Sequence, residues 1–105
     1  MNIPSKIRIS GVDYEVILQP NLVSGSDVFY GTIDYNENNI KIATRGVSQE
    51  KQKITLLHEL FHGIIENAQL DIDDEETVVE AFARGIYQII ADNEDELFGS
   101  CKEFL

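Results

Sequence analysis

Both histidines of this chain, His58 and His62, lie four residues apart in a segment whose apolar residues recur at steps of three and four. This spacing predicts an amphipathic helix with one side packed against the rest of the fold. Residues four apart on a helix share a face and are about 6 Å apart along its axis, so the two imidazoles can hold one metal ion. The apolar residues are Ile54, Leu57, Leu60, Phe61, Ile64 and Ile65.

Glu59 follows the first histidine and gives the segment the form H-E-x-x-H. In zinc peptidases with this arrangement, the histidines ligate Zn²⁺ and the glutamate is the general base. Coincidental helical spacing is the alternative explanation. Three features weigh against it: the amphipathic context, the absence of a third histidine from the sequence, and Gly63, where a side chain could crowd a neighbouring strand or helix.

A catalytic zinc generally takes three protein ligands and leaves the fourth position to water. Because the sequence has no third histidine, we expect a carboxylate. Glu76 and Glu80 lie four residues apart in the next predicted helix, with Glu75 beside them. A solvated acidic helix face is the ordinary explanation of such residues. The spacing alone allows either Glu76 or Glu80 to be the ligand.

The first half of the chain reads as strands. Alternating apolar residues predict a hairpin that turns near residues 10–13, and a second hairpin joins residues 30–35 to residues 40–43. Residues 21–28 are rich in Ser, Gly and Asp, which predicts a loop or a short helix.

The second half reads as helices. Ser48 is the expected N-cap of a helix from Gln49 to Ala68. A second helix follows the acidic residues 71–75 and ends near residues 92–93, before a short helix or frayed tail to Leu105. We therefore expect a single α+β domain over residues 1–105. It would have a small antiparallel sheet of three or four strands, followed by two packed helices that carry a zincin-like site.

Charge restricts the partners. The chain has 19 acidic and 8 basic residues and a formal net charge of −11, so it should repel nucleic acid and suit a basic or neutral protein. The first 19 residues have no long apolar run, which argues against a signal peptide or membrane span and favours the cytoplasm. The single cysteine, Cys101, is interpreted as incidental because it has no partner for an internal disulfide.

Two segments together resemble the ImmA/IrrE family of zinc metallopeptidases, especially its compact members from phages and other mobile elements. They are residues 55–63 (TLLHELFHG) and residues 76–83 (ETVVEAFA), and the strands at residues 30–35 and 40–42 are also similar. In that family a glutamate lies six residues before the Phe-Ala pair, and an Asn or Asp lies two residues before it. The resemblance thus implies that Glu76 is the third zinc ligand and that Glu80 orients a ligand histidine from outside the ligand set.

The function that we expect is zinc-dependent hydrolysis of a peptide bond inside a protein partner, and the resemblance implies a partner such as a mobile-element repressor. Glu59 would take a proton from a metal-activated water and pass it to the leaving amine. An extended substrate would pair with an exposed strand edge, for which residues 40–43 are the candidate. Side chains that could donate to the oxyanion are Tyr14, Tyr30, Tyr35 and Tyr87.

Two other functions fit the same residues. The chain could be a catalytically silent module that keeps the metal and binds a protein, although pure metal binding does not need Glu59. It could also hold a structural zinc, but closed structural sites favour cysteine-rich ligand sets, and no cysteine is near the motif in the sequence.

Overall fold

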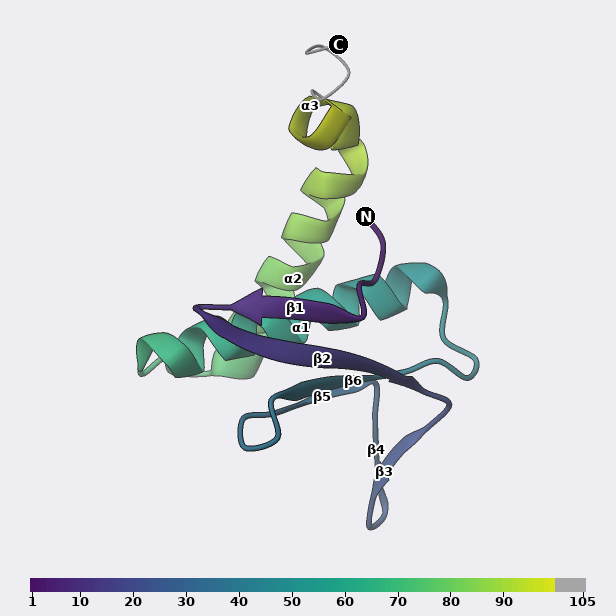
Figure 1. Ribbon diagram of the computed structural model, residues 1–105, viewed down its shortest axis with the longest axis vertical. Coiled ribbons are helices and arrows are strands. Elements are labelled where there is room, and N and C mark those ends of the chain that lie inside the picture. Colours follow the sequence, from purple (N-terminus) through teal and green to yellow (C-terminus); the bar gives the residue numbers. More distant parts are fainter. Residues whose placement is uncertain (100–105) are drawn as a thin grey trace.

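The first two strands of the computed structural model form the hairpin that the alternating pattern predicts (Figure 1). Strand β1 covers Lys6–Ile9, strand β2 covers Val12–Gln19, and the two pair antiparallel. Ser10 and Gly11 form the turn, with φ values of 49° and 87°. A two-residue hairpin turn of this kind needs positive φ at both positions. The structure describes residues 1–99.

The second predicted hairpin is also present, but it joins the first one in an unexpected direction. Strand β5 (Gly31–Asp34) pairs antiparallel with β6 (Asn39–Ala43), and β6 pairs parallel with β2, which gives the order β1-β2-β6-β5. The α+β class is confirmed, whereas the expected antiparallel sheet is wrong because the sheet is mixed. Residues 20–38 are a long enough crossover to return the chain in the parallel direction.

Part of that crossover forms a separate hairpin. Strands β3 (Leu22–Ser24) and β4 (Asp27–Phe29) pair with each other around Gly25, whose φ is 61°. The expectation of a loop or short helix over residues 21–28 is therefore wrong. Strands of three residues are too short to show the alternation that identifies a strand in sequence.

The position of β6 changes which strand can accept a partner. β6 is hydrogen-bonded on both sides, and its Ile40 and Ile42 are 0% exposed, as suits a central strand. The expectation that residues 40–43 offer a free edge is therefore wrong. The edge of the sheet on this side is β5.

Helix α1 covers Gln49–Ala68 as predicted, and the Ser48 hydroxyl accepts a hydrogen bond from the Lys51 backbone N–H at 3.1 Å. The helix lies across one face of the sheet (Figure 1). Gly63 permits close packing, because a Cβ there would lie 3.1 Å from Ile9 and 3.2 Å from Ile33. The core between helix and sheet contains Ile9, Tyr14, Val16, Ile40, Ile42 and Leu56.

Helix α2 covers Glu75–Asp92 and ends where the sequence predicts, and a short helix α3 (Glu94–Phe98) follows. α2 packs on α1 through Leu57 and Ala83 and extends away from the sheet (Figure 1). Within residues 1–99, none of the helices combines the length and the apolar character needed to cross a membrane. Cys101 lies outside the described residues.

Candidate metal centre

The α1 helix brings both histidines to one face, as their spacing predicts. The Nε2 atoms of His58 and His62 lie 3.2 Å apart, and the ring centroids are 4.8 Å apart in an edge-to-face arrangement. Packing of Leu56 on the sheet and of Leu57 on α2 fixes the rotation of α1 about its axis. Both rings are thereby held at the junction between α1 and the beginning of α2.

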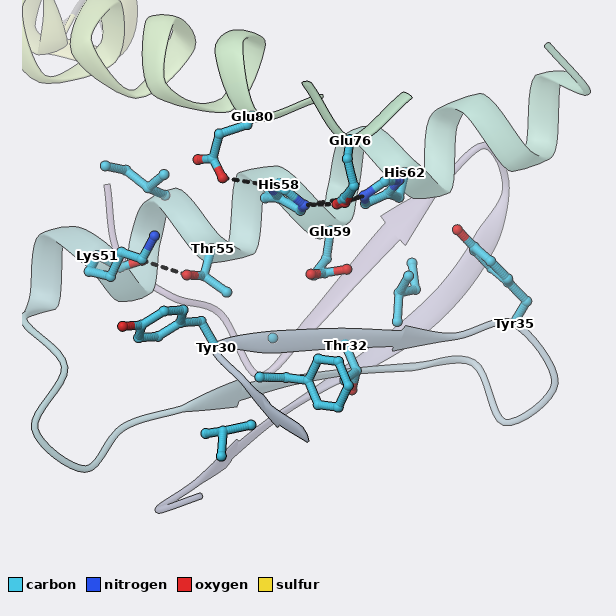
Figure 2. A pocket seen from close by; sticks show the side chains of 15 residues that line it. Tyr30, Thr32, Tyr35, Lys51, Thr55, His58, Glu59, His62, Glu76 and Glu80 are labelled. Atoms are coloured by element: carbon cyan, nitrogen blue, oxygen red, sulfur yellow. Dashed lines mark hydrogen bonds and ion pairs between the residues drawn. The ribbon is translucent and has the colours of Figure 1, made fainter. Parts of the chain in front are cut away.

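Glu76 supplies the third group. Its Oε1 atom lies 2.7 Å from Nε2 of His58 and 2.9 Å from Nε2 of His62, and its Oε2 atom lies 3.1 Å from Nε2 of His62. Figure 2 shows the Glu76 side chain reaching from α2 to the two rings. The two Nε2 atoms and one carboxylate oxygen therefore converge on a single point between the helices.

These three groups could hold a metal ion. One ligand atom from each of His58, His62 and Glu76 lies within 4.8 Å of the others. Ligand atoms about 2.0–2.1 Å from a tetrahedral zinc lie roughly 3.3 Å apart, so small side-chain movements would accommodate the ion. Two imidazoles and a carboxylate suit several divalent transition metals, and the donor set does not select zinc among them.

The outer nitrogen of each ring also faces a carboxylate. Nδ1 of His62 lies 2.6 Å from Oε2 of Glu75, and Nδ1 of His58 lies 3.4 Å from Oε2 of Glu80. Glu80 also pairs with Arg84, at 3.1 Å. Carboxylates in this position fix the ring orientation and raise the basicity of metal-ligating histidines. The structure thus places Glu76 at the Nε2 atoms and Glu80 behind His58.

Glu75 is the contact that the sequence did not assign. It is the first residue of α2, next to Glu76, and in sequence it reads as one more acid at the positive end of a helix. The sequence feature that could have identified Glu75 is its position directly before the candidate ligand Glu76. Which histidine it would reach depends on how α2 crosses α1, and that is a property of the packed structure.

The charges of the centre are mutually dependent. Burial lowers the pKa of the His62 imidazole, but hydrogen bonds to Glu75 and Glu76 raise it more, so the net pKa is above its ordinary value of 6.5. Burial raises the pKa of Glu76, and the hydrogen bonds from His62 and His58 outweigh this and lower it. The metal-free centre therefore favours a protonated His62 beside an ionised Glu76.

Glu59 lies below the three candidate metal ligands and points into the same cleft (Figure 2). Glu59 is only 7% exposed. This burial raises the pKa of its carboxyl, and the attraction of His58 and His62, which lowers the pKa, does not offset the increase. Gly31 leaves room for it, because a Cβ on Gly31 would lie 3.2 Å from Oε2 of Glu59. A buried carboxylate with a raised pKa is suited to accept a proton near neutral pH.

The cleft in front of these groups has a volume of about 550 Å³. Edge strand β5 and the preceding residues of the β3–β4 hairpin form its lower wall, and α1 forms its upper wall (Figure 2). Tyr30 and Tyr35 line it, whereas Tyr14 is buried in the sheet core and Tyr87 packs between the helices. Two of the four tyrosines considered from sequence therefore reach the cleft.

Comparison of the chain with models of known protein families, with curated proteins and with solved structures finds no match. The function must therefore be inferred from the residues and their geometry.

Proposed function

We propose that this protein is a zinc-dependent endopeptidase. The observation that carries the proposal is the convergence of His58, His62 and Glu76 on one point, above a cleft into which the buried Glu59 also points. This arrangement combines a candidate metal-binding group with a separate candidate base, as hydrolysis of a peptide bond requires. A site that only bound metal would not need a buried carboxylate beside it.

The protein residues have distinct roles in this reaction. Zinc bound to the three ligands would supply Lewis acidity to polarise the peptide carbonyl and acidify water. Glu59 accepts the proton of the attacking water and then donates it to the nitrogen of the leaving amine. Glu75 and Glu80 orient the rings of His62 and His58 through their Nδ1 atoms.

Edge strand β5 is suited to bind the substrate backbone. Gly31, Thr32 and Ile33 belong to this strand and line the cleft below Glu59. A sheet edge presents backbone N–H and C=O groups that can pair with an extended peptide. A peptide added to β5 would run along the floor of the cleft and bring one of its carbonyls below the histidines.

The nature of the substrate is inferred from charge and from the family resemblance. A net charge of −11 favours a basic or neutral partner. The resemblance to ImmA/IrrE peptidases suggests a regulatory protein, such as the repressor of a mobile element. Proteins encoded next to this one are therefore the first candidates.

The test is the Glu59→Gln variant, which keeps the shape of the side chain and removes its basic carboxylate. Zinc content and folding should persist, while cleavage of the partner should fall by about 10² to 10⁴-fold. Elemental analysis and a cleavage assay on the same preparations measure the two effects. If the wild-type protein contains zinc and binds a partner as tightly as Glu59→Gln does but does not cleave it, the protein is instead the catalytically silent binding module.

A further inference from the structure

A positively charged side chain, that of Lys51, lies at the end of the cleft opposite Tyr35 (Figure 2). Lys51 is the only Lys or Arg among the described residues that line it, whereas Glu59, Glu76 and Glu80 contribute carboxyl groups. The Lys51 ammonium lies 4.8 Å from the centroid of the Tyr30 ring, a cation–π distance (Figure 2). Among residues 1–99, no carboxylate forms an ion pair with this ammonium.

The position of Lys51 in its helix is locally unfavourable. It is the third residue of α1 after the N-cap Ser48, where a Glu or Gln would complete a capping box by reaching back to the N-cap N–H. A cation in the first turn also faces the positive end of the helix dipole. Natural proteins break such local preferences mainly at functional sites. The side chain of Lys51 is therefore explained better by what enters the cleft than by the stability of α1.

The distance from Lys51 to the candidate metal centre corresponds to a short peptide. Lys51 precedes His58 by seven residues, which is roughly 10 Å along the helix axis. An extended peptide advances about 3.3 Å per residue. A peptide lying along β5 would have the carbonyl of one residue below the histidines. A residue about three positions away in the same peptide would therefore lie beside Lys51.

We propose that Lys51 binds a carboxylate of the substrate, about three residues along the peptide from the cleaved bond. This inference rests on the proposed peptidase function. Because the protein as a whole is strongly acidic, the carboxylate must be an isolated one in an otherwise neutral or basic segment. Val28, Phe29 and Tyr30 form an apolar wall beside this path, which suits apolar side chains next to the carboxylate.

The carboxylate can come from an Asp or Glu side chain or from a free peptide C-terminus, and a binding experiment separates the two. The probes are short peptides with a metal-binding hydroxamate at one end, made in two series with the hydroxamate at the amino or the carboxyl end. In each series, one peptide has Glu and one has Gln at the third residue, and the C-terminus of these peptides is amidated where it does not carry the hydroxamate. The series with the hydroxamate at the amino end also includes a further pair, in which one peptide ends in a free carboxylate and the other in an amide. Calorimetry with the zinc-loaded protein measures their affinities.

In at least one series, the wild-type protein should bind the carboxylate peptide about 3- to 10-fold more tightly than its neutral counterpart, as expected for a partly exposed ion pair. Lys51→Met should abolish this preference, and Lys51→Glu should bind a peptide with Lys at that position better than one with Glu. Lys53→Met is the matched control. It removes the same charge from the same helix, outside the set of residues that line the cleft, and should keep the preference.

Three results would overturn the inference. If the wild-type protein binds charged and neutral peptides equally in both series, or if Lys51→Met keeps the preference, Lys51 does not recognise a carboxylate while the peptidase proposal stands. If no hydroxamate binds the zinc-loaded protein, the proposed function fails as well. Melting curves of each variant verify that it is folded.

Discussion

The Nδ1 atom of His62 lies 2.6 Å from Oε2 of Glu75, the first residue of α2. The same imidazole contacts Glu76 through its other nitrogen, Nε2. His62 is therefore held between two consecutive residues of one helix turn, and the position of α2 on α1 determines its ring orientation. This relationship connects the packing of the two helices to the capacity of the centre to bind metal.

Replacing Glu75 should accordingly weaken metal binding without removing a ligand. Glu75→Gln eliminates the charge that orients His62, and we expect zinc affinity to fall by about 10- to 100-fold. Glu76→Ala should lower zinc affinity more, because Glu76 is the proposed third ligand. Competition titrations with a zinc chelator give these affinities. Asp73→Asn, a neutralisation at an exposed residue just before α2, is the control, and equal effects of Glu75→Gln and Asp73→Asn would contradict the role of Glu75.

Stabilisation by zinc and the stability of the metal-free fold should change with pH in opposite directions. Burial lowers the pKa of His62, but hydrogen bonds to Glu75 and Glu76 raise it above 6.5 overall, so its protonated form stabilises the metal-free fold fully below about 6.5. That contribution is lost as pH rises through the raised folded-state pKa. The contribution of Glu76, whose pKa is lowered, is present above 4.5 and is lost as pH falls through its folded-state value.

Zinc binding requires a neutral imidazole, so the stabilisation by zinc should increase as pH rises from about 6 to 8. Over the same range, the His62 contribution to the free energy of unfolding should decrease in chelator-treated protein. Urea unfolding at several pH values, with zinc or with chelator, measures both trends. His62→Gln should weaken both trends. A zinc effect that does not change with pH would exclude His62 as a ligand.

The extent of α1 could be predicted because its determinants are local. Ser48 caps the helix within three residues, and the apolar steps around His58 have helical period. The contact between Glu75 and His62 has no such local determinant. It depends on the rotation and crossing of α2, which are set by packing of Ala83 against Leu57. Consecutive acids in a sequence do not show which of them faces a neighbouring helix.

The sheet illustrates the same limit. The β1–β2 and β5–β6 hairpins could each be predicted from their own alternation and turn residues, but the parallel pairing of Val16 with Ile40 joins segments 24 residues apart. No repeating pattern encodes such a pairing. The consequence for function is direct, because this pairing makes β6 central and leaves β5 as the edge beside Glu59.

Gly31 should be required for the approach of β5 to the helix. A Cβ at this position would clash with Cγ2 of Thr55, whose hydroxyl donates a 2.7 Å hydrogen bond to the Lys51 carbonyl. Because that bond and the branched Cβ restrict the Thr55 side chain, Gly31→Ala should lower the free energy of unfolding by about 1–3 kcal/mol.

The double variant Gly31→Ala/Thr55→Ser provides the decisive comparison. Serine keeps the hydroxyl and removes the methyl group that the new Cβ would meet, so the double variant should recover much of the lost stability. Urea unfolding of both single variants and the double variant forms a double-mutant cycle. Additive effects of the two substitutions would show that the methyl contact is not the cause.

Tyr35 should stabilise the oxyanion if the protein is a peptidase. Burial, with the nearby charges of Glu66, Glu75 and Glu59, raises the pKa of the Tyr35 phenol to about 12, so the hydroxyl keeps its proton at neutral pH. Its hydroxyl points toward the His62 end of the cleft, whereas the Tyr30 hydroxyl points away from it (Figure 2). A neutral donor at this end can bind the negative charge that develops on the carbonyl oxygen.

Tyr35→Phe should therefore reduce kcat by about 10²-fold with little change in KM or zinc content, since the hydrogen bond would strengthen mainly in the transition state. Tyr30→Phe is the matched control. It removes the same hydroxyl from the same cleft and keeps the ring that faces Lys51, so kcat should change little. Steady-state kinetics on a cleaved partner measure both variants. Equal losses of kcat would indicate that the two tyrosines shape the cleft. An unchanged kcat in Tyr35→Phe would show that the Tyr35 hydroxyl does not stabilise the oxyanion.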